Sequence, residues 1–240
     1  MPRRIRQRKR RRISRRPVRR KRPKASPSAA DKMMKLHTYL KADGSFDLEA
    51  YRQVQIAGNH RKLRNQWASE DQISMLAQHI TYRIGAPRSG LCHGTRRGAE
   101  QVWFRKHLPD CEVIGTEISD TAEQFPHTIQ WDFHDVKNEW VGAMDFIYSN
   151  SFDHTYDPEK CLDAWMSCIR PGGLCILEHS DDHEMSSVCA LDPFGATLWC
   201  MPYLIATWGK SCYAVREILT ASSRSRRNHP VTRFLLIHKF

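Results

Sequence analysis

The sequence predicts an α/β fold in which a mostly parallel sheet has helices on both faces and ends in an antiparallel pair of strands. Short apolar runs alternate with helical patterns from residue 89 to about residue 178, which is typical of a parallel sheet. A Pro-Gly-Gly turn at residues 171–173 separates the last of these helices from the strand that follows. Two further apolar runs near the C-terminus have no helix between them, which predicts a hairpin.

Two helices are predicted ahead of the sheet. The first covers residues 45–63 with Asp47 as its cap, because apolar residues follow one helical face. The second follows Ser69, which forms a capping box with Gln72, and it ends near Gly85.

The alternating part supplies five strands and three helices. The strands are predicted at residues 90–92, 112–116, 128–131, 144–148 and 174–178. The helices are predicted at residues 97–108, 119–124 and 158–169, the last with Asp157 as its cap and Pro158 in its first turn.

The C-terminal part adds a helix and two strands. Residues 192–210 predict a capped helix that is interrupted at Pro202. Residues 212–219 and 231–239 predict two strands joined by a Ser/Arg loop, which brings the sheet to seven strands. The domain division expected from these patterns is an arm and linker at 1–30, a helical addition at 31–88 and an α/β domain at 89–240.

The net charge of +12 is concentrated in an N-terminal arm. Residues 1–24 hold 15 Lys and Arg and no acid, which leaves 23 basic against 26 acidic residues in 31–240. Such a segment has little to bury and repels itself, so we expect it to be disordered alone. It suits polyanions, so residues 3–24 predict binding to nucleic acid or another polyanion, and a nuclear or nucleolar address in a eukaryotic cell. An organellar presequence and a solvating tail are the alternatives.

Composition also argues against several other classes. No apolar run approaches the 18 or so residues needed to span a bilayer, so a membrane protein is not expected. The eight cysteines form no C-x-x-C pair, and several lie in apolar patterns. They predict reduced core thiols of an intracellular protein rather than a structural zinc site.

The stretch GLCHGTRRGAE, residues 90–100, has the form of a nucleotide-binding turn. It lies between an apolar strand and a helical pattern, and Gly94 and Gly98 suit a tight turn and a close helix approach. Arg96 stands where such turns carry a middle glycine, and Cys92 stands where they often carry an acid. The turn is therefore altered, and we interpret it as functional.

From Ser89 to Phe240 the chain resembles the class I S-adenosylmethionine-dependent methyltransferases, which have a Rossmann-like fold. Four features carry the resemblance in order: the turn CHGTRRG, Glu117 at the end of VIGTE, Asp132 at the end of IQWDF, and the run DFIYSNSFDH with the later DPEKCLDAWMSCIRPGGLCILEH. The resemblance implies S-adenosylmethionine as cofactor and a methyl acceptor as partner.

The resemblance also implies cofactor-binding residues. Glu117 would accept hydrogen bonds from both ribose hydroxyls, and Asp132 with the Phe133 backbone would recognise adenine. Ser149 and Ser151 would face the methionine part. The full set of expected cofactor-binding residues is His93, Gly94, Thr95, Arg96, Gly98, Glu117, Ile118, Asp132, Phe133, Ser149 and Ser151.

The methionine part needs charged partners. Arg96 or Arg97, at a helix start, is a candidate for its carboxylate. Without an acid at position 92, the ammonium group would need backbone carbonyls or Asp153.

His154 is the candidate catalytic base, because histidine titrates near neutral pH. His179 and His183 are further candidates, and they belong to a cluster that could hold a divalent metal although a solvated loop is the more common outcome: Glu178, His179, Asp181, Asp182 and His183. No metal is expected. An apolar group could cover the pocket or pack in the core: Trp199, Met201, Tyr203, Leu204 and Trp208.

Two functions remain open at this point. The first is an active methyltransferase, whose acceptor is favoured as a small molecule or sugar because SNSF replaces the Asn-Pro-Pro-aromatic motif of amine methylases. The second is a catalytically silent protein of the same fold that binds RNA, DNA or a large assembly through its arm. An NAD-dependent enzyme fits less well, because of the terminal hairpin.

Overall fold

A seven-stranded sheet forms the centre of the protein in a computed structural model that describes residues 33–222 and 231–240. Its strands run in the order β4 (Thr128–Gln130), β3 (Glu112–Glu117), β2 (Ser89–His93), β5 (Met144–Ser149), β6 (Ile169–His179), β9 (Val231–Lys239) and β8 (Tyr213–Ser222). The first five are parallel, and β9 is antiparallel to both of its neighbours. The predicted α/β fold with its C-terminal hairpin is confirmed.

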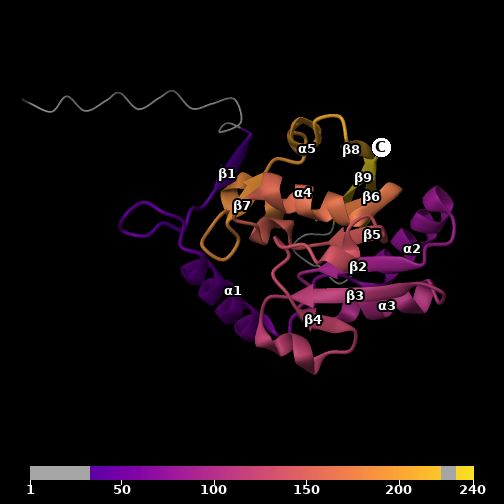
Figure 1. The fold of residues 1–240 in the computed structure, drawn as a ribbon, viewed down its shortest axis with the longest axis horizontal. Helices are drawn as coiled ribbons and strands as arrows, with labels where there is room; N and C mark the ends of the chain where they lie inside the picture. The colour runs from indigo at the N-terminus through magenta and orange to yellow at the C-terminus, as the bar shows by residue number, and fades with distance from the viewer. Residues whose placement is uncertain (1–32, 223–230) are drawn as a thin grey trace, which may run out of the picture.

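Helices cover both faces of this sheet (Figure 1). The core on one face includes residues of α4 (Pro158–Cys168) and α5 (Met201–Gly209), and the core on the other includes residues of α2 (Glu70–Ile84) and α3 (Ala99–His107). The remaining helix, α1 (Leu48–Lys62), lies at the end of the sheet toward which β3 points.

The helix caps follow the sequence. The Asp47 carboxylate accepts the backbone N–H of Ala50 at 3.0 Å, and the Asp157 carboxylate accepts that of Lys160 at 3.1 Å. The Ser69 hydroxyl accepts the backbone N–H of Gln72 at 3.4 Å. Each bond satisfies a donor of the first helical turn, which has no partner within the helix.

The segment 192–210 differs from its prediction. It begins with a short strand, β7 (Phe194–Ala196), which pairs with β1 (Met34–Leu36) in a separate two-stranded sheet. The helix starts only at Met201, so Pro202 lies in its first turn instead of interrupting it. The prediction was wrong because a proline without an N–H is favoured at a helix start, where no acceptor is available for that group.

Two other elements are adjusted. Residues Asp120–Gln124 form a 3-10 helix, where an ordinary helix was expected. Helix α4 ends at Cys168, and the Pro-Gly-Gly segment lies inside β6, where the pairing with β5 shifts register. Further 3-10 turns occur at Asn138–Trp140, Phe152–His154, Asp181–His183 and Met185–Ser187.

The thiols divide between core and surface. Cys92, Cys111, Cys161, Cys168 and Cys175 are buried, as expected, whereas Cys189 and Cys212 are exposed and Cys200 is half-buried. None of the helices in 33–222 is long and apolar enough to cross a membrane. The expectations for the arm, the linker to residue 30 and the Ser/Arg loop at 223–230 lie outside the described residues.

Candidate functional site

A cleft of about 510 Å³ lies where the parallel strands end. The loops after β2, β3, β4 and β5 form its floor, and α1 and Leu191 cover it. Ligands of open α/β sheets bind at this end of the strands. The lining residues are Tyr51, Gln55, Gly58, Asn59, Lys62, Gly94, Arg96, Glu117, Ile118, Asp132, Phe133, Ser151, His154 and Leu191.

The glycine turn keeps its shape despite the arginine. Gly94, Arg96 and Gly98 all have positive φ, at 71°, 45° and 70°. A Cβ on Gly94 would stand 2.6 Å from the Ser151 Cβ, so only glycine fits this position. Arg96 therefore adopts the left-handed backbone conformation that glycine adopts without strain, and the turn remains open to the cleft.

Glu117 is held at the end of β3 with its carboxylate in the cleft. Oε2 accepts the backbone N–H of Arg96 at 3.0 Å, and Oε1 accepts that of Ser119 at 3.1 Å. Burial raises the pKa of this carboxyl, although both backbone donors oppose the rise. Each carboxylate oxygen keeps a further lone pair, which could accept a hydrogen bond from a ligand bound in the cleft.

Asp132 lies beside Phe133 after β4. Its Oδ1 accepts the backbone N–H and the ring Nδ1 of His134, at 3.1 and 2.8 Å, and its Oδ2 lies 3.6 Å from the Arg52 guanidinium. Burial alone would raise the pKa of Asp132, but the contacts with His134 and Arg52 lower it below its ordinary value. The carboxylate is therefore ionised at neutral pH.

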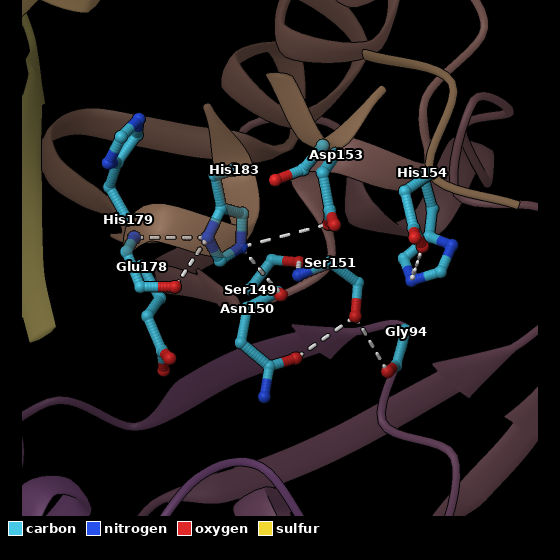
Figure 2. Close-up of polar contacts among 12 residues, drawn as sticks. Gly94, Ser149, Asn150, Ser151, Asp153, His154, Glu178, His179 and His183 are labelled. Carbon is cyan, nitrogen blue, oxygen red and sulfur yellow. Dashed lines mark hydrogen bonds and ion pairs between the residues drawn. The ribbon is translucent and has the colours of Figure 1, made fainter. Parts of the chain in front are cut away.

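The serines at and just after the end of β5 tie the floor of the cleft together, as Figure 2 shows. The Ser151 hydroxyl has two acceptors for its one proton, the Gly94 carbonyl at 3.1 Å and the Asn150 side-chain oxygen at 3.0 Å. The Ser149 hydroxyl donates to the His93 carbonyl at 3.0 Å and is fully buried. Ser151 lines the cleft, and Ser149 lies behind it.

The structure thus brings most of the expected cofactor residues into one cleft. His93 is buried behind it, stacked on Trp165 with ring centroids 4.7 Å apart, and burial lowers its pKa to about 3. Gly98 packs on Gln101 at the start of α3. Thr95 lines a smaller neighbouring cavity. Those in the cleft are Gly94, Arg96, Glu117, Ile118, Asp132, Phe133 and Ser151.

His154 also lies in the cleft, under α1. Its Nδ1 lies 2.8 Å from the Gln55 side-chain oxygen and 2.9 Å from the Leu191 carbonyl. Two acceptors at Nδ1 require the proton there, which leaves Nε2 as the basic nitrogen, 3.7 Å from the Asp192 carboxylate.

His179 and His183 serve a neighbouring cavity of about 240 Å³ instead. His179 donates from Nε2 to the Ala196 carbonyl, and burial lowers its pKa to about 4, so its ring is neutral. The His183 Nδ1 accepts the Ser180 backbone N–H, and its Nε2 lies 3.3 Å from the Asn150 carbonyl and 3.8 Å from Asp153 (Figure 2).

The described residues gather three metal-type donors at one place, within 4.8 Å of one another: Asp153, His154 and Asp192. Among the described residues, the group at 178–183 that could have held a metal does not come together in this way. Acidic groups often gather in this way without an ion, so we assign no metal to this trio.

The apolar group that could cover the pocket or pack in the core packs in the core for the most part. Met201, Leu204 and Trp208 are buried, and Trp199 and Tyr203 are 78% and 58% exposed. None of the five lines the main cleft.

Sequence reasoning missed the cover supplied by α1. Gln55 and Asn59 stand one turn apart on its buried side, where polar side chains are uncommon, and this spacing was the available signal. Nothing in the local sequence marks Leu191 as a site residue, because only the tertiary fold brings it over the cleft.

The fold of the protein is similar to that of solved methyltransferases, although its sequence matches no family model and no curated protein. The plantazolicin methyltransferase BpumL, solved with a triazolic analogue and S-adenosylhomocysteine (SAH), has a TM-score of 0.60 and 13% identity, over 79% of this chain and 95% of its own. This protein has the Rossmann-like class I methyltransferase fold.

Two further solved methyltransferases show the same fold. The 1,6-didemethyltoxoflavin-N1-methyltransferase of Burkholderia thailandensis has a TM-score of 0.58 and 12% identity, over 85% of this chain and all of its own. The N-methyltransferase NodS of Bradyrhizobium japonicum has a TM-score of 0.55 and 14% identity, over 77% of this chain and 98% of its own. Both structures contain SAH.

Proposed function

We propose that the protein is an S-adenosylmethionine-dependent methyltransferase. The observation that carries the proposal is the joint position of two carboxyl groups at the ends of adjacent strands, in one cleft with the glycine turn: Glu117, which is buried, and Asp132, which is half-buried. Carboxyl groups seldom occupy such positions without a partner to bind. The methyltransferases of the same fold, solved with SAH, support the same conclusion.

The residues of the cleft fit this cofactor. Glu117 would accept hydrogen bonds from the ribose hydroxyls, and its two backbone donors fix the carboxylate for that purpose. Asp132 is ionised and would accept the adenine amine, with the Phe133 backbone beside it. Gly94, whose missing Cβ keeps the floor low, would allow close approach of the cofactor.

The cofactor supplies an activated methyl group, and the protein's task is to hold an acceptor in line with it. His154 is the residue we assign to proton removal, because Nε2 is its basic nitrogen and the Asp192 carboxylate would stabilise the protonated ring. A hydroxyl or amine acceptor would need such a base. We favour a small molecule or sugar as acceptor, since α1 and Leu191 cover the cleft.

Titration of SAH into the full-length protein by isothermal titration calorimetry tests the proposal. We expect binding with a micromolar Kd. Glu117→Ala should weaken it roughly tenfold to a hundredfold, because the side chain that accepts hydrogen bonds from both ribose hydroxyls is lost. Glu112→Ala, at the exposed opposite end of β3, is the matched control and should bind as the wild type does. Absence of binding by folded wild-type protein would contradict the proposal and favour the silent alternative.

For the arm we propose a second role, binding of nucleic acid or another polyanion through residues 3–24, with nuclear or nucleolar placement in a eukaryotic cell. Its support is the density of 15 basic residues without an acid in 1–24. Binding to a generic RNA, measured by fluorescence anisotropy, should weaken steeply between 50 and 200 mM salt. A salt-independent affinity would argue against this role.

A further inference from the structure

The glycine turn has Cys92 where related turns often carry an acid, and an acidic side chain from another element lies near this position. The Cys92 side chain is fully buried in the core shared with α2 and α3, and it does not line the cleft. Burial raises the pKa of its thiol, and the nearby Glu100 carboxyl raises it further. Glu100, in the first turn of α3, therefore lies close to the position where the missing acid would stand.

Glu100 is a buried carboxyl with one oxygen unused. It is 3% exposed, and its Oε1 accepts hydrogen bonds from the Gln66 amide at 3.0 Å and the Asn150 amide at 3.4 Å. Its Oε2 has no hydrogen-bond partner in the described part of the chain. A buried carboxylate oxygen without a hydrogen-bond donor lowers the stability of the folded state, which points to a ligand that supplies the donor.

Glu100 lines a cavity that adjoins the main cleft. The second cavity has a volume of about 210 Å³ and is lined by Asn65, Gln66, Trp67, Gly94, Thr95, Arg96, Glu100 and Asn150. It shares Gly94 and Arg96 with the cleft, so the two spaces meet at the glycine turn. A ligand whose nucleoside fills the cleft would extend its tail past Gly94 into this cavity.

The cavity carries one cationic and one acidic side chain. Arg96 lines it, and its Nη1 donates to the Asn65 carbonyl at 3.4 Å. Arg97 instead donates to the Arg64 carbonyl, is exposed and lines neither space. Asp153 lines the separate cavity of His179 and His183 instead, so it does not face the tail. This charge pattern complements a zwitterionic amino-acid group.

We propose that Glu100 binds the ammonium group of the cofactor's methionine part in place of the acid absent at Cys92, while Arg96 binds its carboxylate. The inference rests on the proposed function and extends it to the tail of the ligand. Glu100 would then be a cofactor-binding residue contributed by α3 instead of β2.

The surroundings of Glu100 give the proposal a proton signature. Burial raises its pKa to about 7; Glu178 adds to the rise, whereas Gln66 and Arg96 oppose it. Cys92 and Tyr148 also interact with the Glu100 charge, but burial raises both of their pKa values well above the ordinary range, so neither titrates near pH 7. An ammonium group favours the ionised carboxylate, so binding should release the proton that Glu100 carries.

The test compares SAH with 5′-deoxy-5′-methylthioadenosine, which has the same nucleoside but no amino-acid tail. Calorimetry of the full-length wild-type protein in buffers of different ionisation enthalpy measures the protons released. For SAH we expect about half a proton at pH 7, more at pH 6 and almost none at pH 8.5, since Glu100 is half protonated near pH 7. The thioether nucleoside should release none.

Glu100→Gln keeps the side chain's size and its bond to Gln66, and Glu112→Gln is the exposed control. We expect Glu100→Gln to weaken SAH at least tenfold, to change the affinity of the tailless nucleoside less than twofold and to abolish proton release. Equal weakening of both ligands, or no weakening of SAH, would overturn the role of Glu100. If Glu100→Gln does not fold, the wild-type proton release alone decides. Wild-type protein that binds neither ligand would refute the proposed function itself.

Discussion

The backbone N–H of Arg96 donates to Oε2 of Glu117 at 3.0 Å, so the altered position of the glycine turn directly orients the acid at the end of the next strand. This bond needs only the backbone conformation at Arg96, whose φ is 45°. The side chain is thereby left to make other contacts. The substitution of the middle glycine therefore keeps the turn's geometry and adds a cation beside it.

Arg96→Gly separates these two contributions. Glycine adopts positive φ without strain but is more flexible when unfolded, so we expect a stability gain of about 0.5 kcal/mol by chemical denaturation. The affinity for SAH should fall at least fivefold, while the tailless nucleoside binds as before. Arg97→Gly, one residue on, serves as control. Unchanged SAH affinity would show that the arginine side chain is not part of the site.

Gly58 sets how closely α1 covers the cleft. A Cβ there would overlap the Leu191 methyl groups, so Gly58→Ala should displace that side chain and cost up to about 1 kcal/mol of stability, because the helical alanine offsets part of the strain. Ligand affinity should fall with it. The double variant Gly58→Ala with Leu191→Ala removes the overlap, and it should recover part of both losses. A thermal unfolding series with SAH titrations measures the effect, and additive losses would contradict direct contact.

Two buried histidines make stability depend on pH. Burial lowers the pKa of His93 to about 3 and that of His179 to about 4, both below the ordinary value of 6.5. Between its folded pKa and about 6.5, each ring therefore binds more protons in the unfolded chain than in the folded protein. Stability should decrease as pH falls below about 6.5, by up to roughly 1.4 kcal/mol per pH unit for each ring.

His93→Phe tests the larger of these shifts. The substitution keeps a ring stacked on Trp165 and removes the titrating group. Urea unfolding at pH 7.5, 6 and 5 should then show a shallower loss of stability than the wild type. The same slope in both proteins would mean that His93 is not the group responsible.

Asp132 should stabilise the fold in a different pH range. Its folded pKa lies below the ordinary carboxyl value, so its contribution is present above about pH 4 and is lost as pH falls further. Asp132→Asn removes this titration, and we expect unfolding curves of the variant to change less between pH 4.5 and 3. Asp135→Asn, nearby but without a resolved ion pair among the described residues, is the comparison. Identical curves for wild type and Asp132→Asn would refute the assignment.

The cap of α4 provides a test of local stability. Asp157→Ala removes the acceptor of the Lys160 backbone N–H and should cost about 1 kcal/mol, whereas Asp157→Ser should retain most of the stability. Thermal unfolding measures both. Equal losses would mean that the bond at 3.1 Å contributes little.

The sequence was sufficient for the central sheet because its signals are local. Apolar runs, the caps at Asp47, Ser69 and Asp157, and the Pro-Gly-Gly turn each act within a few residues. The β1–β7 pair was missed because three-residue strands have no visible periodicity and their partners stand about 160 residues apart. A proline can either interrupt a helix or stand in its first turn, and the local sequence around Pro202 does not distinguish the two. In the structure Pro202 stands in the first turn of α5.

The candidate site divides in the same way. Positions that follow a strand directly, such as Glu117 and Asp132, could be predicted because strand ends meet at one edge of the sheet. Glu100 could not, since its side chain reaches the site from the buried side of α3. His93 and Ser149 belong to the expected stretches, yet strand alternation turns them behind the cleft.

The pairing of β1 with β7 fixes where the described chain begins, on the same side of the molecule as α1 (Figure 1). Residues 25–32 separate the last basic residue of the arm from Met33, and they span at most about 30 Å when extended. If the arm binds a polyanion as proposed, that polyanion would be tethered to this side of the molecule, and an acceptor site on it would have a high effective concentration. Truncating the arm would then change the apparent KM for an acceptor attached to that polyanion and leave a free acceptor unaffected.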